Sequence, residues 1–252
     1  MKMISTIALM SLVAVAPASA QDGQQTARSY QVRGFDRIDL SGCDIVSVSL
    51  GAAYGVTARG RAANIDALRI DTDGATLRIR RRDDSCNGHD RRVAITVTLP
   101  SLKAVHVGGA AEMNLPALDV PTFAVGTSGA SVLRLPALRS GAVSFDLLGA
   151  SQVIVQNLRA ERASLDTSGA SVLRADGDVR QLAIDSSGAS NVNARALSSP
   201  NVTIGASGTA NVRAGAAQQA QVSASGMANV TVEGKPRCTV SKSGLARIAC
   251  GR

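Results

Sequence analysis

The chain has 252 residues and a formal net charge of +8, and 45% of its residues are hydrophobic but only 2% are aromatic. With two Tyr, three Phe and no Trp, it lacks the aromatic platforms on which nucleic-acid modules stack bases, so we expect no nucleic-acid partner. Its arginine-rich surface instead favours polyanions, among them anionic glycans.

Residues 1–20 have the three parts of a secretory signal peptide. Lys2 supplies the positive start, residues 4–15 the apolar segment, and residues 18–20 the small-residue cleavage site. We expect cleavage between Ala20 and Gln21, followed by a linker over residues 21–33. The apolar segment is too short to span a bilayer of about 30 Å, so we predict no transmembrane segment in the mature chain.

Residues 34–107 predict strands that repeat irregularly. Apolar and polar residues alternate over residues 38–46, 56–59, 68–71, 77–80 and 93–99, which is typical of strands with one buried face. The first of these segments contains a Ser-Gly pair between two alternating runs. Residues 80–92 are polar and charged, and they predict a loop that Cys86 ties down.

Residues 108–252 repeat a short phrase, most often Ser-Gly-Ala-Ser, every 18–20 residues. Its glycines are Gly109, Gly129, Gly149, Gly169, Gly188, Gly208, Gly226 and Gly244. Apolar residues recur four and six positions on either side of these glycines and alternate with polar residues. Helical structure cannot keep such a period of two on one face. A short, regular repeat of this kind predicts a solenoid.

We therefore predict an all-β fold, a single-stranded parallel β-helix (β-solenoid) of about 18–20 residues per rung. Each rung has two strands that meet at the glycine corner, and leucines nine positions later, such as Leu118, add a third inward contact. Eight rungs at roughly 4.8 Å spacing make a rod about 40 Å long. Such a rod offers extended faces rather than a deep pocket.

Two polar columns are the candidate binding residues, because stacking equal rungs turns one side chain into a ladder. The Asp column, three positions before the glycine, comprises Asp146, Asp166 and Asp185. Like charges on adjacent strands repel, and a bound cation could relieve this; solvated carboxylates are the simpler interpretation. The Arg column, five positions after the glycine, comprises Arg134, Arg174 and Arg213, and it suits either a polyanion or solubility.

The sequence predicts no catalytic residue, metal or cofactor. The serines two positions after the glycine, Ser131, Ser151, Ser171 and Ser190, are best explained by packing, because His89 and His106 are the only histidines available as a base. The four cysteines lack metal-ligand spacing, and in an exported chain they predict disulfides. Of the three connectivities, we favour Cys43 with Cys86 and Cys238 with Cys250.

The last repeat predicts a C-terminal cap. Lys242 replaces a small or apolar residue, and it is surrounded by Lys235, Pro236, Arg237 and Arg247. We interpret this basic charge and the proline as features that prevent two solenoids from pairing end to end. Cys238 and Cys250 lie six residues on either side of Gly244. In an open corner their Cα atoms would be farther apart than the limit of about 7 Å, so we expect residues 238–250 to fold as a hairpin.

The repeats and the export signal together resemble the family of auto-transporter adhesin head GIN domains, also labelled DUF2807. The resemblance rests on residues 35–42 (Phe-Asp-Arg-Ile-Asp-Leu-Ser-Gly), residues 73–79 and the Ser-Gly-Ala-Ser phrases, and it covers about residues 34–248. It implies a β-helix, no catalytic residues and a role in adhesion. This chain has Ala or Ser where the family often has Gly-Asp or Gly-Asn, so the contacts that an acid at this position would make are not expected here.

We expect an exported, non-enzymatic binding module in the periplasm or at the surface of a Gram-negative bacterium. Its partner would be an anionic glycan, another cell-envelope component or a protein. One alternative is a polysaccharide lyase or hydrolase that uses the Asp column, since such enzymes need clustered acids in a groove. The other is a purely structural envelope protein.

Overall fold

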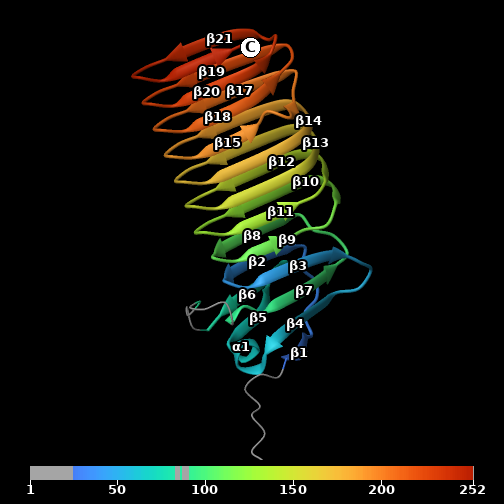
Figure 1. The fold of residues 1–252 in the computed structure, drawn as a ribbon. Coiled ribbons are helices and arrows are strands. Elements are labelled where there is room, and N and C mark those ends of the chain that lie inside the picture. Colours follow the sequence, from blue (N-terminus) through green and yellow to red (C-terminus); the bar gives the residue numbers. More distant parts are fainter. Residues whose placement is uncertain (1–24, 83–85, 87–90, 252) are drawn as a thin grey trace, which may run out of the picture.

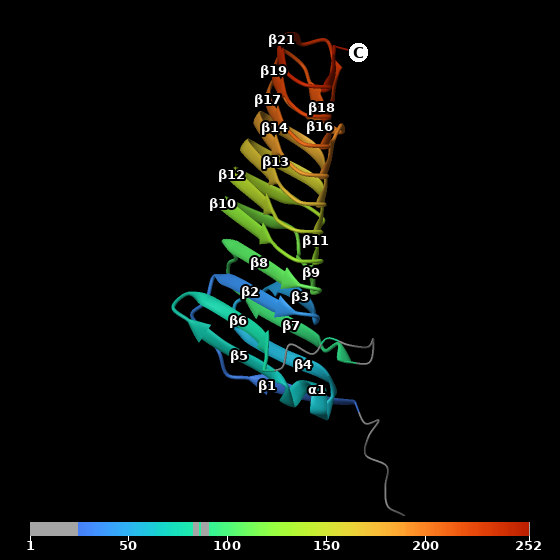
Figure 2. The ribbon, with the colours of Figure 1, turned by 90° about the vertical axis from the view of Figure 1, so that its left-hand side faces the viewer.

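The computed structural model describes residues 25–82, 86 and 91–251. The expected signal peptide and its cleavage site between Ala20 and Gln21 lie outside the described residues. The regular structure of the described chain is almost entirely β-strand, arranged as a rod (Figure 1) whose N-terminal end is broader when the rod is turned by 90° (Figure 2).

The rod is a parallel β-solenoid, as the repeats predict. Its strands are β8 (Ala104–Gly109), β9 (Glu112–Asn114), β10 (Leu118–Thr127), β11 (Val132–Leu135), β12 (Leu138–Leu147), β13 (Gln152–Thr167), β14 (Val172–Ser186), β15 (Asn191–Ala194), β16 (Leu197–Ser198), β17 (Asn201–Ala206), β18 (Asn211–Ala216), β19 (Gln219–Ala224), β20 (Asn229–Gly234), β21 (Arg237–Lys242) and β22 (Arg247–Cys250). Each pairs in parallel with the strand one turn away, for example Phe145 with Leu165. The corners from Gly109 to Gly244 enclose about seven full turns (Figure 2).

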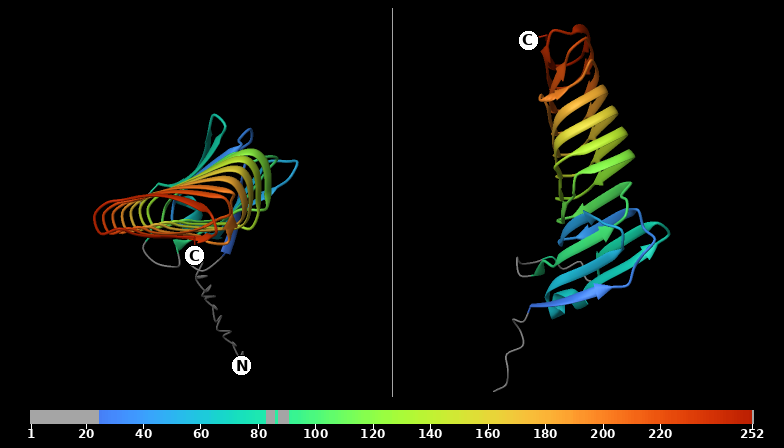
Figure 3. Two further views of the ribbon diagram at one scale, coloured as in Figure 1. Left: turned by 90° about the horizontal axis from the view of Figure 1, so that it is seen from above. Right: turned by 90° about the vertical axis from the view of Figure 1, so that its right-hand side faces the viewer.

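The core fills the inside of the rungs. Every predicted inward column from Val105 to Val232 is buried, and leucines nine positions after the corner, such as Leu138 at 1% exposure, close the third side. Along the rod axis each rung is a flattened loop whose two arms run close together (Figure 3, left). The outward residues, which alternate with the core, therefore lie on regular external faces.

The corner requires glycine for two separate reasons. The corner glycines have positive φ, for example +77° at Gly169, a region that side chains other than glycine rarely occupy. A Cβ atom added to Gly169 would also lie 2.5 Å from the carbonyl oxygen of Gly149 on the preceding rung. The repeated phrase thus allows successive corners to stack in direct backbone contact.

The N-terminal region follows the irregular β-helix that we expected over residues 34–107 only in part. β2 (Arg37–Gly42) and β3 (Ile45–Leu50) form a rung, which stacks under β8 and β9 with Gly42 opposite Gly109. The other strands are β4 (Gly55–Arg61), β5 (Leu68–Asp73), β6 (Thr76–Arg81) and β7 (Ala94–Leu99), with one short helix, α1 (Ala62–Asp66). β6 pairs in parallel with β2 and β7 with β3, so these two strands extend the stack by one layer, whereas the β4–β7 and β5–β6 pairs are antiparallel. This cap covers the strand edges that the first rung would otherwise expose (Figure 2).

The expected linker over residues 21–33 is also partly wrong. Gln25–Tyr30 form strand β1, which pairs antiparallel with β4 along its whole length, from Gln25 opposite Arg61 to Tyr30 opposite Val56. All of its residues before Tyr30 are exposed. Backbone pairing, an exposed ion pair between Arg28 and Asp66 and the packing of Tyr30 hold this strand, so its sequence carries no alternating hydrophobic pattern.

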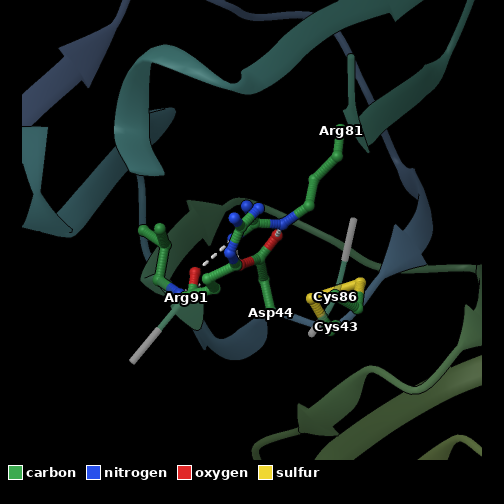
Figure 4. Close-up of a disulfide and its surroundings, with 6 residues drawn as sticks. Cys43, Asp44, Arg81, Cys86 and Arg91 are labelled. Atoms are coloured by element: carbon green, nitrogen blue, oxygen red, sulfur yellow. Dashed lines mark hydrogen bonds and ion pairs between the residues drawn. A yellow bond between two sulfur atoms is a disulfide. The ribbon is translucent and has the colours of Figure 1, made fainter. Parts of the chain in front are cut away.

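A buried ion pair connects the cap to the first rung. Asp44, which is fully buried, takes an inward position beside the Gly42 corner, and its Oδ1 accepts hydrogen bonds from Arg81 Nη2 at 2.5 Å and Val93 N at 2.9 Å. Arg81 Nη2 also donates to the carbonyl oxygen of Arg91 at 2.5 Å. The Cys43–Cys86 disulfide lies next to this pair, with a Cα–Cα distance of 5.7 Å (Figure 4).

The hairpin expected for residues 238–250 is wrong. β21 pairs in parallel with β19 and β22 with β20, and Gly244 has the corner φ of +68°. Cys238 and Cys250 nevertheless form a disulfide with a Cα–Cα distance of 6.3 Å. Our reasoning placed the arms of a rung too far apart, whereas the flattened rung brings positions six before and six after the corner together.

Candidate functional site

The Asp column is a true ladder in the structure. Asp146 on β12 is in register with Asp166 on β13, and Asp166 is in register with Asp185 on β14. Each aspartate lies between two inward residues of its strand, as Asp146 does between Phe145 and Leu147, so it must point outward. The three carboxylates therefore lie on consecutive rungs of one external face.

These aspartates line a shallow hollow of about 430 Å³. Serine and glycine surround them, including Ser168, Ser187 and Gly205, and the side chain of Leu148, which is 55% exposed, stands at one border. The hollow thus combines carboxylate and hydroxyl groups with one exposed aliphatic group. This combination suits a ligand that offers hydroxyl or amino groups and a small apolar surface.

The carboxylates are not equivalent. Burial, and to a smaller extent the charge of Asp166, raise the pKa of Asp146 above its usual value. Asp166 instead has a hydrogen-bond donor, because Ser164 Oγ donates to its Oδ2 at 2.9 Å. The ladder therefore holds repelling negative charge that a donor or a cation from a ligand would relieve.

Glycines border the ladder on both sides. Asp185 Oδ1 lies over Gly205 of the next rung, where an added Cβ would be 2.3 Å from it. At the other end His106 lies over Gly126, with Nδ1 2.8 Å from the position of an added Cβ, and Gly126 is in register with Asp146. Neither glycine is at a corner. Because they have no side chains, they leave room for Asp185 and His106 to lie over them.

The Arg column does not form a comparable cluster. Arg134 pairs in register with Ile154 and Arg174 with Asn193, so a whole rung separates each arginine from the next, about 9.6 Å at the usual strand spacing. Arg134 also forms an ion pair with Glu112. The column lies on the arm that follows the corner, whereas the Asp column lies on the arm that precedes it.

The serines beside the corner are buried, with exposures of 0–1%, which agrees with a packing role. Ser151 and Ser190 have buried hydroxyl partners that the sequence did not single out. The hydroxyls of Thr127 and Ser151 are 2.7 Å apart, as are those of Ser186 and Ser190, and Ser186 Oγ also accepts a hydrogen bond from Thr167 Oγ1 at 2.9 Å. The hydroxyls of Ser131 and Ser171 have no hydrogen-bond partner among the described residues. These hydroxyls lie inside the solenoid, away from any external ligand.

The structure adds features that sequence reasoning missed. Leu148 occupies a corner position, and its side chain is exposed in the fold. Gly205 is important because the side chain of Asp185 lies over it. Within residues 25–82, 86 and 91–251, no group of three or more His, Cys, Asp or Glu side chains has a geometry that could hold a metal ion. The same residues include no helix with the length and hydrophobicity needed to cross a bilayer.

The stacked glycine corners and the buried inward columns define a parallel β-solenoid. The chain belongs to the family described as "Putative auto-transporter adhesin, head GIN domain", whose model matches residues 34–236. Family membership and the two disulfides indicate an exported protein. Among curated proteins no match is found.

Solved structures share this fold at low sequence identity. A putative adhesin from Parabacteroides distasonis is 16% identical with a TM-score of 0.80, and the match covers 90% of this chain and 98% of that one. A putative lipid binding protein from the same species is 16% identical with a TM-score of 0.77, covering 92% and 98%. A putative adhesin from Parabacteroides merdae is 15% identical with a TM-score of 0.76, covering 92% and 98%. These likenesses establish the fold alone.

Proposed function

We propose that the protein is a non-enzymatic binding module of the adhesin type, and that its ligand is a cell-surface glycan that lies against the Asp column. The observation that carries this proposal is the register of Asp146, Asp166 and Asp185 on one open hollow. Ionised carboxylates accept strong hydrogen bonds from sugar hydroxyl or ammonium groups. The exposed Leu148 side chain offers an apolar contact for the C–H face of a sugar ring.

The negative charge of the Asp column favours some kinds of glycan over others. Three carboxylates on adjacent rungs repel a uronate or phosphate group, so a neutral or amino-bearing glycan fits the hollow better than an anionic one. The Arg column has only one arginine in every two rungs, and Arg134 is already paired with Glu112. An anionic glycan that binds would therefore have to use another face of the rod.

A hydrolase is the second candidate, since Asp146 has a raised pKa beside Asp166, and glycosidases use one protonated and one ionised carboxyl group. Those two groups normally flank the scissile bond. Here the aspartates project side by side from a single face, which favours contact along a chain over attack from two sides. This geometry supports binding without cleavage.

The test is isothermal titration of the mature chain with chitosan hexamer, cellohexaose and polygalacturonate, together with an assay for new reducing ends. We expect saturable binding of chitosan hexamer, without products, that weakens about tenfold in Asp166→Asn through loss of a charged hydrogen bond. The matched control is Asp119→Asn, an exposed aspartate outside the hollow. Equal weakening in both variants, binding of polygalacturonate alone, or no retained glycan would contradict the proposal. Release of reducing ends would instead support the hydrolase.

A further inference from the structure

The last described rung differs from all the others in what it exposes. All six residues of β21 are exposed, including Val240 at 47%, although its equivalents on earlier rungs, such as Val222, are buried. At the adjacent corner, the position after the glycine is alanine in the rungs from Gly109 to Gly188, but it becomes Met227 and Leu245 in the last two. These two side chains are 61% and 77% exposed.

Among the described residues, only β19 pairs with β21, so half of the backbone hydrogen-bonding groups of β21 meet no other described strand. Arg237 N–H donates to the carbonyl oxygen of Gln218 at 2.8 Å and Ser243 N–H to that of Ala224 at 3.0 Å, so these groups face the preceding rung. Because the direction of the peptide groups alternates along a strand, the N–H and C=O groups of Cys238, Val240 and Lys242 face the opposite, open edge. The Cys238–Cys250 disulfide holds this edge to the other arm of the rung.

The charge at this edge has one sign. From Gly234 to Gly251 the sequence contains Lys235, Arg237, Lys242 and Arg247 but no Asp or Glu. None of these four forms an ion pair with a residue in the part of the chain that the structure describes. A second copy of the chain would bring an equally basic edge to this one and be repelled.

Each end of the solenoid has a charged residue at an inward position, but only the one at the N-terminal end has an ion-pair partner among the described residues. At the N-terminal end, Asp44 occupies an inward corner position and the cap provides Arg81 as its partner. At the other end, Lys242 stands in register with the buried Ala224, in an inward column, and meets no carboxylate among the described residues. An added strand with an acidic residue next to Lys242 would give Lys242 an ion-pair partner, as Arg81 does for Asp44.

We propose that the open edge of β21 binds an extended acidic segment of another protein by strand addition. Main-chain hydrogen bonds to Cys238, Val240 and Lys242 would hold the segment, and side chains at alternate positions would give specificity. In the parallel register of the earlier rungs, the segment would place an apolar residue over Val240 and an acid over Lys242, two positions later. The basic charge that excludes a second copy is then also what selects the partner.

The test uses the mature chain and two rhodamine-labelled peptides, measured by fluorescence anisotropy. The acidic peptide is Asp-Ile-Thr-Val-Ser-Asp-Gly, whose two acids would face Arg237 and Lys242, and the control peptide has Lys in place of both Asp. We expect the acidic peptide to bind at least tenfold more tightly, with affinity that falls as salt is added. In Lys242→Glu this preference should decrease at least tenfold, while Arg159→Glu, an exposed arginine elsewhere on the rod, should leave it unchanged.

A backbone variant separates strand addition from simple charge attraction. Val240→Pro removes an N–H group at the open edge but none of the N–H groups that are directed at β19. It should weaken binding of the acidic peptide at least fivefold and leave the melting temperature of the protein unchanged. Four results would each overturn the proposal. They are equal binding of both peptides, an effect of Arg159→Glu as large as that of Lys242→Glu, full affinity in a folded Val240→Pro variant, and self-association of the chain that Lys242→Glu abolishes.

Discussion

Replacing a corner glycine by alanine tests how the rungs stack. In Gly169→Ala the new residue must keep a φ of +77°, which costs an L-residue about 1–2 kcal/mol. Its Cβ would also lie 2.5 Å from the carbonyl oxygen of Gly149. Backbone atoms cannot rotate away as a side chain can, so relieving this overlap adds about 1–3 kcal/mol. We expect a total destabilisation of about 3 kcal/mol.

The matched control is Gly74→Ala, in the turn between β5 and β6. Gly74 also has a positive φ, +55°, but an added Cβ would meet no atom within 4 Å. Gly74→Ala should therefore cost only the conformational part, about 1–2 kcal/mol. Circular dichroism during heating should show Tm lowered by about 6–12 °C in Gly169→Ala and by about one to two thirds of that in Gly74→Ala. Equal shifts would refute the contact between stacked corners.

Three further predictions concern the ion pair, the Asp column and the disulfides. Asp44→Ala leaves the buried Arg81 without its carboxylate partner and should lower the free energy of unfolding by about 3–5 kcal/mol in urea titrations. The control Asp119→Ala loses only an exposed ion pair with Arg139 and should have little effect. Similar losses of stability in both variants would contradict this prediction. Asp166→Asn should move the pKa of Asp146, followed by NMR, back toward its usual value. Because the folded-state pKa of Asp146 is raised, ionisation of Asp146 destabilises the fold as pH rises above 3.8. Asp146→Asn should therefore raise the urea midpoint of unfolding at pH 7 but not at pH 3. The same increase at both pH values would rule this out. A non-reduced digest should contain the linked pairs Cys43–Cys86 and Cys238–Cys250, and free thiols or crossed pairs would exclude the geometry described.

The regular part of the fold could be predicted because each rung repeats the same physical requirements. A period-2 pattern buries one face of each strand, and the glycine at a fixed position allows the corner, so the inward columns and the Asp ladder follow from counting along the chain. Those inferences need only local geometry and identical stacking. The parallel register of Asp146, Asp166 and Asp185 is their direct result.

The remaining features depend on contacts between residues far apart in the chain. β1 is held by backbone pairing with β4, and its exposed side chains leave no hydrophobic pattern to read. The partner of Asp44 is 37 residues away in the cap, so no local spacing indicates that ion pair. The distance between Cys238 and Cys250 depends on how far the rung is flattened, which is a property of the whole stack.

The position of the glycan on the rod tests the central functional claim most directly. Chemical shifts of the backbone amides should be followed while the mature chain is titrated with chitosan hexamer. We predict that the largest changes fall in residues 144–148, 164–168 and 183–187, which surround the Asp column on three consecutive rungs. Changes centred on Arg174 and Arg213, or no changes at saturating glycan, would contradict the claim that this face binds the ligand.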